Sequence, residues 1–262
     1  MENNLSTNIH PTAIVDSRAE LGSGVTVGPY AVIEGSVTIG DGTTIMAQAH
    51  VLNGTTMGQD CRIFQGAVIG GESQDLKYDG ADTLLKIGDR TTIREYATVG
   101  RGTRAEDPGT RIGSDTLLMG YAHIGHDCII GDQAIIANYV GLGGHTEIHD
   151  WASIGAGTLI HQFCHIGTHS FVGAGYRVVQ DVPPYILAAG EPLRYAGINI
   201  VGLKRRGFST EVHQNLKRAY RLIFRSSYNR QQTVEIIKSE MGPSPEIQTV
   251  LAFIEQSTRG LI

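Results

Sequence analysis

The sequence predicts a mainly β protein in which a long parallel solenoid is followed by a small C-terminal α-helical domain. Three observations support this prediction. Large aliphatic residues recur at every sixth position over most of the stretch from Val15 to Val178. Two polar segments interrupt this period, and beyond Ser209 the apolar spacing becomes that of helices. A period of six fits neither an amphipathic helix nor a half-buried strand, and it is typical of solenoids built from six-residue repeats.

Each six-residue unit is expected to form one short strand. Three units would make a triangular coil, which stacks on the next coil at the roughly 4.8 Å spacing of paired strands. The aliphatic side chains would point inward, and glycine, asparagine and aspartate would serve the corners. Twenty-five residues share the period and predict about eight to nine coils: Val15, Leu21, Val27, Ile33, Ile39, Ile45, Val51, Met57, Ile63, Ile69, Ile87, Ile93, Val99, Ile112, Leu118, Ile124, Ile130, Ile136, Leu142, Ile148, Ile154, Ile160, Ile166, Val172 and Val178.

The three cysteines occupy a repeated position of the solenoid. Cys61, Cys128 and Cys164 each lie two residues before a periodic aliphatic residue, where other repeats place alanine or threonine. We therefore expect packed core thiols and neither metal ligands nor disulfide partners. An odd number of cysteines, in a chain whose first ten residues do not resemble a secretion signal, predicts a cytoplasmic location.

Two polar segments, 71–86 and 100–111, are predicted to be loops inserted into a solenoid domain of residues 1–184. Insertions on solenoids often lie on the binding face. Solenoids also tolerate loops without a function, and the role of 100–111 stays open. Pro183 and Pro184 cannot enter a strand ladder, so we expect the solenoid to end there.

A connecting segment, 185–208, and a helical domain, 209–262, are expected to follow. Ser209 is a suitable N-cap for a first helix, whose apolar stripe comprises Val212, Leu216, Ala219, Tyr220 and Ile223. A second helix is marked by Val234 and Ile237. A third begins at Pro245, which suits a first-turn position, and carries Ile247, Val250, Leu251 and Ile254.

Charge and hydropathy argue against two classes of partner. The 21 basic and 26 acidic residues give a net charge of −5, so a broad nucleic-acid-binding surface is not expected. No stretch approaches the roughly 18 continuous apolar residues of a membrane span. The expected partners are therefore neither nucleic acid nor the interior of a bilayer.

Four of the ten histidines gather on one side of the predicted coils: His123, His126, His145 and His161. They flank three periodic residues that are 18 apart, so we expect one histidine face that extends on the order of 10 Å over three coils. A chance cluster and a metal site both stay open as alternatives to a catalytic face. Outward-facing solenoid residues are polar and include some histidines by chance, and three imidazoles are a common zinc set. The chain shows no spacing motif for metal ligands.

The string AHIGHDC (122–128) contains the pair with the most obvious chemistry. An imidazole at His126 suits general-base catalysis, and the carboxylate of Asp127 could orient it. Adjacency does not guarantee that contact, because neighbours on a strand face opposite ways. The glycines before His145 could present a backbone N–H to an oxyanion. No serine or cysteine stands in an activating context, which favours direct attack by the acceptor.

The sequence resembles one family, the bacterial UDP-N-acetylglucosamine acyltransferases of the hexapeptide-repeat group. The resemblance covers the entire chain in order and is carried by NIHPTAIV (8–15), QDLKY (74–78), AHIGHDC (122–128), HQFC (161–164), QDVPPY (180–185), GLKRRGF (202–208) and STRGL (257–261). It implies a left-handed parallel β-helix, whose handedness the spacing does not reveal.

The resemblance also implies the reaction. A 3-hydroxyacyl chain would pass from acyl carrier protein to the 3-hydroxyl of UDP-N-acetylglucosamine, which is the first step of lipid A synthesis. The enzyme would be a homotrimer with its sites in the clefts between subunits. No cofactor and no metal are implied, because the acyl chain arrives as a thioester. Much of the catalysis should then be positioning of two bound reactants.

Roles for individual residues follow from the same resemblance. His126 matches the general base, Asp127 its support, and the backbone N–H of Gly144 the oxyanion donor. Contacts to sugar, phosphate and nucleotide match Asp75, Lys77, His123, His145, His161, Gln162, Asn199 and Arg205. The basic run of Lys204, Arg205 and Arg206 could bind the nucleotide and the acidic carrier protein, although a solvated turn would look the same.

Three positions depart from the expected family pattern. Gly100 stands where a histidine often precedes Arg101, and Tyr121 replaces a smaller polar residue; both put details of sugar recognition in doubt. Ala174 falls where a residue tunes acyl-chain length, so the preferred length stays open.

Rival functions also stay open. The same transfer onto a 3-amino sugar nucleotide would give an amide. A zinc-dependent hydrolase or hydratase could use a similar trimeric solenoid. A purely structural solenoid would need neither QDLKY nor the histidine face.

Overall fold

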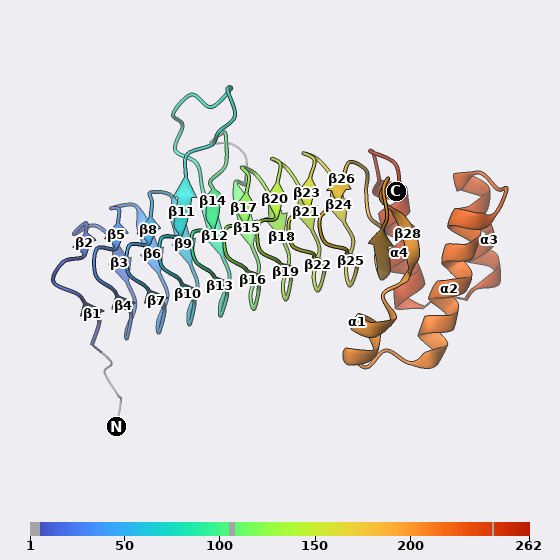
Figure 1. Ribbon diagram of the computed structural model, residues 1–262, viewed down its shortest axis with the longest axis horizontal. Coiled ribbons are helices and arrows are strands. Elements are labelled where there is room, and N and C mark those ends of the chain that lie inside the picture. The colour runs from blue at the N-terminus through green and yellow to red at the C-terminus, as the bar shows by residue number, and fades with distance from the viewer. Residues whose placement is uncertain (1–5, 105–107, 243) are drawn as a thin grey trace.

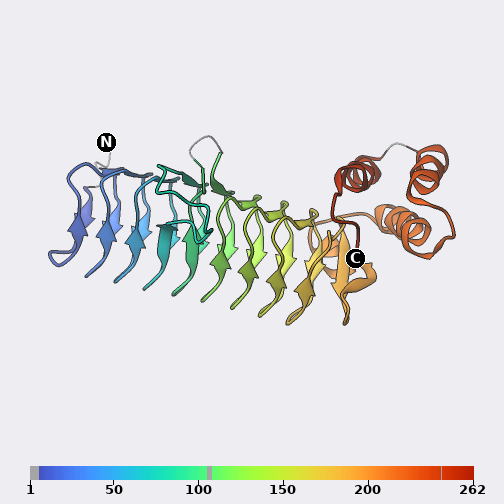
Figure 2. The same cartoon turned by 90° about the horizontal axis from the view of Figure 1, so that it is seen from above.

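The structure is a parallel solenoid that runs most of the length of the molecule and ends in a group of helices (Figure 1). It is a computed structural model that describes residues 6–104, 108–242 and 244–262. The prediction of a mainly β solenoid with C-terminal helices is confirmed. Viewed from above, the coils stand in a row and the helices lie beyond the last of them (Figure 2).

Three sheets form the sides of the coil. Sheet A contains β1 (Asn8–Ile9), β4 (Thr26–Val27), β7 (Thr44–Ile45), β10 (Arg62–Ile63), β13 (Thr92–Ile93), β16 (Leu117–Leu118), β19 (Ile135–Ile136), β22 (Ser153–Ile154), β25 (Phe171–Val172), β27 (Ile186–Ala189) and the antiparallel β28 (Arg194–Ile198). Sheet B contains β2 (Ile14–Val15), β5 (Val32–Ile33), β8 (His50–Val51), β11 (Val68–Gly71), β14 (Thr98–Gly100), β17 (His123–Ile124), β20 (Gly141–Leu142), β23 (Leu159–Ile160) and β26 (Arg177–Val178). Sheet C contains β3 (Glu20–Leu21), β6 (Val37–Ile39), β9 (Thr55–Met57), β12 (Leu85–Ile87), β15 (Thr110–Ile112), β18 (Ile129–Ile130), β21 (Glu147–Ile148) and β24 (His165–Ile166).

The stacking register follows the six-residue period. Ile124 pairs with Leu142 and Leu142 pairs with Ile160, so residues 18 apart lie on top of one another. In most strands the second residue points into the coil and is buried, whereas the first faces outward. Every periodic aliphatic residue from Val27 to Val178 is buried. The solenoid interior is therefore a continuous stack of aliphatic side chains.

Both polar segments leave the solenoid at the same edge, the corner between sheets B and C, which we call the B–C corner. The first lies between β11 and β12, and the second between β14 and β15 of the next coil. Residues 105–107 of the second lie outside the described part of the chain. The first loop projects from the row of coils (Figure 1). Strand pairing resumes in register after each loop, as the pairs Ile63–Ile93 and Ile93–Leu118 show.

The solenoid is longer than the period predicted. The expectation was about eight to nine coils that end at Pro183 and Pro184, but sheet A has eleven strands, of which only the last is antiparallel, for about ten turns. At one end, β1 adds Ile9, which lies six residues before Val15. At the other end, β27 resumes parallel pairing with β25 after the two prolines. The prolines precede this strand, so they interrupt the repeat without ending the sheet.

The three cysteines are free, and all of them are fully buried in the core. They share their inward-facing position with small residues such as Ala49, Ala122 and Ala152. The prediction of packed core thiols is confirmed.

Four helices follow the solenoid: α1 (Ile200–Arg205), α2 (Thr210–Arg225), α3 (Arg230–Glu240) and α4 (Pro245–Gln256). The predicted N-cap is confirmed, because Oγ of Ser209 accepts a hydrogen bond from the amide of Val212. The predicted stripe of α2 buries Leu216, Ala219 and Tyr220. Segment 185–208, predicted as a connection, contains β27, β28 and α1. Among the described helices, none combines the length and apolar character that crossing a bilayer requires.

The C-terminal tail is fastened to the last coils through a buried carboxylate. Oδ1 of Asp181 accepts a hydrogen bond from the amide of His165 at 2.8 Å, and Oδ2 accepts one from the hydroxyl of Ser257 at 2.6 Å. The backbone of Asp181 also pairs with that of Leu261. A buried carboxylate with donors on both oxygens is well compensated, so it holds the helices against the solenoid.

We predict that no thiol reacts with a polar disulfide reagent in the native protein and that all three react after unfolding in denaturant. Burial raises the pKa of Cys128 to about 12 and that of Cys164 to about 11, and it also raises the pKa of Cys61. Little thiolate therefore exists at pH 7, and the reagent cannot reach the sulfur atoms. Thiol counting by absorbance measures both states. A thiol that titrates within minutes in the native protein would contradict the burial.

Candidate functional site

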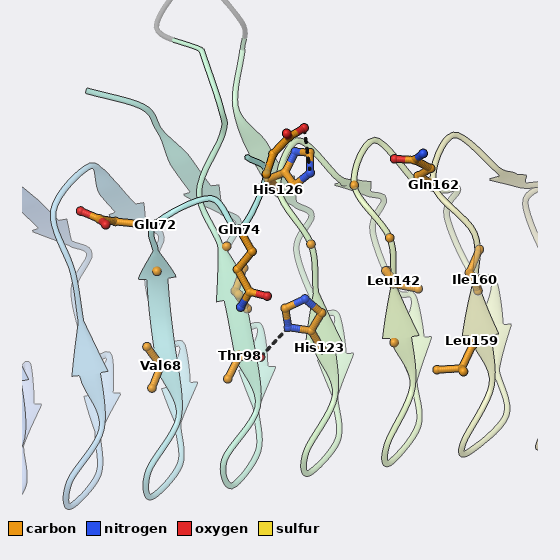
Figure 3. A pocket seen from close by; sticks show the side chains of 18 residues that line it. Val68, Glu72, Gln74, Thr98, His123, His126, Leu142, Leu159, Ile160 and Gln162 are labelled. Carbon is orange, nitrogen blue, oxygen red and sulfur yellow. Dashed lines mark hydrogen bonds and ion pairs between the residues drawn. The ribbon is translucent and has the colours of Figure 1, made fainter. Parts of the chain in front are cut away.

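A cavity of about 680 Å³ lies along sheet B at the B–C corner (Figure 3). Its floor is formed by the outward-facing residues of five successive strands that stand in register: Val68, Thr98, His123, Gly141 and Leu159. Gly141 has no side chain, so the floor is recessed between His123 and Leu159. The first insertion contributes Glu72, Gln74 and Asp75 to the wall. The six-residue period therefore places two of the four predicted histidines, His123 and His126, in one cavity.

His126 lies at the B–C corner and lines this cavity, with 13% of its side chain exposed. Its Nδ1 is 2.9 Å from Oδ2 of Asp127, and its Nε2 is 3.9 Å from Oδ2 of Asp75. A carboxylate beside Nδ1 keeps a proton on that nitrogen, which leaves the lone pair of Nε2 free. This is the tautomer that a general base needs.

The contact between His126 and Asp127 depends on the corner and not on a strand. Asp127 has a φ of 57°, in the left-handed region, which aspartate adopts more readily than most residues. The chain therefore turns sharply between the two residues, and their side chains converge instead of facing opposite ways. The sequence alone left open whether these two side chains touch, and this turn brings them into contact.

Asp127 is itself held from several sides, with 6% of its side chain exposed. Both of its carboxylate oxygens accept a hydrogen bond from the amide of Thr103, at 3.2 and 3.3 Å. Its own amide donates to Oγ1 of Thr110 at 2.8 Å. Nε2 of His145 lies 3.8 Å from its Oδ2. The carboxylate is thus fixed relative to the imidazole that it orients.

Asp75 and Lys77 lie on the first insertion. The amide of Lys77 donates to Oδ1 of Asp75 at 2.9 Å, and this hydrogen bond, with the nearby imidazole of His126, lowers the pKa of Asp75. Asp75 lines the cavity as a carboxylate, whereas Lys77 is exposed and does not line it.

Gly144 lies directly beside the imidazole, one coil further along the solenoid. A Cβ atom built on this residue would come 2.3 Å from Nε2 of His126. The absence of a side chain therefore makes room for the imidazole. It also exposes the backbone of residue 144 to the cavity, which the residue lines together with Gly143. A backbone N–H at this place suits an oxyanion.

The other predicted histidines lie at increasing distance from the cavity. His123 lines it, and its Nδ1 is 2.8 Å from Oγ1 of Thr98 (Figure 3). Burial and the neighbouring His126 lower the pKa of His123, so it is neutral at pH 7. The ring of His145 stacks on Phe163, with centroids 4.7 Å apart, and meets His126 edge-on. His161 is exposed outside the cavity, whereas the adjacent Gln162 lines it.

One cluster has the composition of a metal site. Ligand atoms of His126, Asp127 and His145 lie within 4.8 Å of one another. Two imidazoles and a carboxylate form a set that zinc accepts in proteins. The same atoms already serve one another as hydrogen-bond and charge partners. The geometry therefore fits the predicted pair of His126 and Asp127, which we call the dyad. Metal analysis of the purified protein tests the zinc alternative.

The predicted nucleotide contacts Asn199 and Arg205 lie elsewhere on the single chain. They line a second cavity, of about 1030 Å³, between sheet A and α1. Asn199 caps α1, because its Oδ1 accepts from the amide of Gly202, and its Nδ2 donates to the carbonyl of His169. One chain therefore does not bring Asn199 and Arg205 to the imidazole of His126.

The three residues of the basic run differ in their surroundings. Lys204 and Arg205 are exposed, whereas Arg206 is half-buried. The guanidinium of Arg206 lies over the ring of Trp151 at 4.9 Å, donates to the carbonyl of Trp151 and lies 3.2 Å from Nδ1 of His169. Burial and this guanidinium lower the pKa of His169 to about 4. The side chain of Arg206 is thus engaged within the chain.

The residues that depart from the family pattern lie at two different corners. Gly100 lines the first cavity, and a Cβ on it would meet its nearest neighbour at 3.4 Å, an ordinary contact. Tyr121 is exposed at the corner between sheets A and B, where it stacks between Tyr96 and Tyr139. Ala174 is also exposed at that corner and lines neither of these two cavities.

Sequence reasoning missed two hydroxyl residues behind the predicted pair of His126 and Asp127, of which one contacts the pair directly and the other contacts the first. Oγ1 of Thr103 lies 2.8 Å from Nδ1 of His126, and Oγ of Ser73 lies 2.8 Å from Oγ1 of Thr103. Both belong to the insertions, which carry no repeat. The only available signal was that the two insertions interrupt adjacent coils just before the histidines.

Comparison with known proteins gives matches over nearly the full chain. A family model described as UDP-N-acetylglucosamine O-acyltransferase, domain 2, matches residues 181–262, and the model of bacterial transferase hexapeptide repeats matches 36–71 and 109–144. An acyl-[acyl-carrier-protein]–UDP-N-acetylglucosamine O-acyltransferase of Paracidovorax citrulli is 52% identical, over 97% of this chain and 99% of its own. One from Janthinobacterium is 46% identical, over 97% and 98%.

The chain belongs to the UDP-N-acetylglucosamine O-acyltransferase family. Solved structures agree. The acyltransferase of Bacteroides fragilis has 42% sequence identity and a TM-score of 0.94, over 97% of this chain and 99% of that one. The one from Arabidopsis has 34% identity and a TM-score of 0.84, with the same coverage. The resemblance that the sequence motifs indicated is confirmed, and with it the assignment as an acyltransferase.

We predict that Gly144→Ala lowers kcat/KM for acyl transfer by about 100-fold. The added methyl group would displace the imidazole of His126, and a catalytic group misplaced by about 1 Å can cost that much. Steady-state kinetics measure the effect. Gly71→Ala is the matched control, because Gly71 lines the same cavity but its Cβ would meet nothing closer than 3.9 Å. Equal activity of the two variants would contradict the proximity of Gly144 and His126.

Proposed function

We propose that this enzyme transfers a 3-hydroxyacyl chain from acyl carrier protein to the 3-hydroxyl of UDP-N-acetylglucosamine, as the first step of lipid A synthesis. One observation carries the proposal: a chain similar over 97% of its length to enzymes named for this reaction also has a histidine that lines a cavity and is paired with an aspartate behind it. The cavity can take both a sugar and an extended chain, since its floor is recessed and partly apolar.

His126 acts as the general base in this proposal. Its Nε2 takes the proton of the sugar 3-hydroxyl while that oxygen attacks the carbonyl carbon of the thioester. Asp127 keeps the other proton on Nδ1 and stabilises the imidazolium as it forms. The N–H of Gly144 donates to the oxyanion of the tetrahedral intermediate. Collapse breaks the carbon–sulfur bond, and the imidazolium returns its proton to the departing thiolate of the carrier.

Substrate contacts are assigned by position. We infer that Asp75, His123 and Gln162, which line the cavity, contact the sugar, and that His145 and His161 contact it from the rim. Lys77 reaches the substrate only if its exposed side chain folds toward the cavity. Ala174 sets the acyl-chain length in this proposal, from the neighbouring corner.

A homotrimer would complete the site. The cavity with His126 lies on sheet B, whereas Asn199 and Arg205 line a cavity over sheet A. When three copies pack side by side, sheet A of one copy can face sheet B of the next, and the ring closes. The guanidinium of Arg205 would then bind the diphosphate of a nucleotide whose sugar contacts His126 of the neighbour.

Carrier protein is the second expected partner. Lys204 and Arg205 are exposed cations suited to an acidic carrier, whereas Arg206 is engaged with Trp151 and His169. We propose that Arg206 supports this surface by packing and that Lys204 and Arg205 contact the carrier. A cytoplasmic location remains a prediction, which rests on the three free thiols.

We predict that His126→Ala reduces kcat by about 100- to 10,000-fold, the range for loss of a general base, while the trimer persists. The side chain is partly exposed and packs at a corner, so the aliphatic core is untouched. Kinetics with carrier-linked 3-hydroxyacyl chains and size-exclusion chromatography measure the two outcomes. His161→Ala is the control for a histidine outside the cavity and is expected to raise KM more than it lowers kcat. Retained activity of His126→Ala would rule out the general-base role.

One series of assays measures which acceptor and which acyl-chain length the enzyme prefers. We expect faster transfer to the 3-hydroxyl of UDP-N-acetylglucosamine than to its 3-amino analogue, and one preferred length in a graded series of chains. Faster turnover of the amino analogue would establish the amide-forming alternative. Metal analysis of the purified enzyme accompanies the assay; stoichiometric zinc with activity lost to chelators would establish the zinc alternative instead.

A further inference from the structure

The two insertions meet at the imidazole of His126, and the second supplies a hydroxyl that no repeat residue provides. Thr103 lies three residues into the second insertion and is buried, with 6% exposure. Its Oγ1 is 2.8 Å from Nδ1 of His126. Its amide donates to both carboxylate oxygens of Asp127. One residue therefore contacts both members of the dyad, from the side opposite the cavity.

The direction of these hydrogen bonds follows from their shared atoms. Nδ1 of His126 carries the proton that is shared with the carboxylate of Asp127, so Oγ1 of Thr103 accepts from the same N–H. The hydroxyl hydrogen of Thr103 is then free to donate to Oγ of Ser73, 2.8 Å away. Ser73 is buried in the first insertion, and its Oγ also accepts from the amide of Asp75.

These contacts form a chain that encloses the imidazole. Asp75 lies 3.9 Å from Nε2 on the cavity side, and Ser73 and Thr103 connect it to Nδ1 on the other side. Arg101 fastens the second insertion to the first, since its amide donates to the carbonyl of Gly71 at 2.8 Å and its guanidinium donates to the hydroxyl of Tyr78 at 2.7 Å. The insertions are thus joined to one another as well as to the dyad.

We infer that Thr103 is a positioning residue for the reaction: it fixes the tautomer and the orientation of the His126 imidazole and couples it to the substrate-binding first insertion. This gives the segment 100–111, through its described residues, a role in catalysis. The inference rests on the proposed function, because it requires His126 to act as the base. Thr103 itself does not line the cavity and is not expected to touch the substrate.

The test removes the hydroxyl and keeps the shape. Thr103→Val is expected to lower kcat by about 10- to 100-fold, the effect of one hydrogen bond to a group that becomes charged, with KM for the sugar nucleotide changed less than about threefold. Thr103→Ser, which retains the hydroxyl, is expected to restore kcat to within about threefold of the wild type. Thr83→Val is the matched control, since Thr83 is buried in the first insertion and its hydroxyl has no hydrogen-bond partner among the described residues.

Coupling to the dyad gives a second readout that does not depend on one variant. In a double-mutant cycle, Thr103→Val is expected to cost little in an Asp127→Asn background, because both act through the orientation of His126. Wild-type kcat in Thr103→Val, equal losses in Thr103→Val and Thr103→Ser, or additive losses in the cycle would each overturn the inference. If His126→Ala remains active, the proposed function fails; if His126→Ala is inactive while Thr103→Val is not, only the role of Thr103 fails.

Discussion

The stacking of residues 18 apart along the solenoid is the constraint on which the rest of the molecule depends. Parallel pairing between successive coils keeps each aliphatic residue above its counterpart, roughly 4.8 Å away, and the buried stack that results leaves no freedom to shift the register. A slip of one residue would turn every aliphatic side chain outward. The two insertions preserve this alignment, because the pairs Ile63–Ile93 and Ile93–Leu118 are stacked in the same way after the loops. Corner residues are therefore placed as strictly as core residues.

The candidate site is built from two columns of residues at the B–C corner. His126, Gly144 and Gln162 stand one above another, and so do Asp127, His145 and Phe163, all of the second column in the left-handed region. The first column explains why Gly144 carries no side chain, since the imidazole of His126 occupies that space. The second explains the stacking of His145 on Phe163 and the closeness of His145 to Asp127. The turn that closes each coil thus also brings an imidazole, a carboxylate and the backbone of a glycine together.

The period predicted the parts of this site that obey it, whereas Asp75 in the first insertion was predicted only through the family resemblance, and Thr103 and Ser73 were missed. The core positions, the buried thiols and the histidine face follow from counting, because the register leaves one arrangement for them. The contact of His126 with Asp127 depends on the left-handed backbone conformation of Asp127 at the corner. The alternation of side chains along a strand does not predict such a conformation. Thr103 and Ser73 lie in loops whose paths depend on side-chain contacts such as that of Arg101 with Tyr78. The solenoid also continued through β27 past Pro183 and Pro184, because prolines between strands do not interrupt the ladder itself.

The separation of the two cavities bears on the proposed homotrimer. A triangular coil turns its sheets in different directions, and within one chain His126 on sheet B and Arg205 beside sheet A line separate cavities. The second cavity is larger and is lined by apolar residues such as Ile135, Phe171 and Leu187, with cations at its rim. An apolar surface with a polar, charged edge is typical of a protein contact. Assembly and nucleotide binding would then use the same surface, so that a subunit acquires a complete site only when its neighbour is in place.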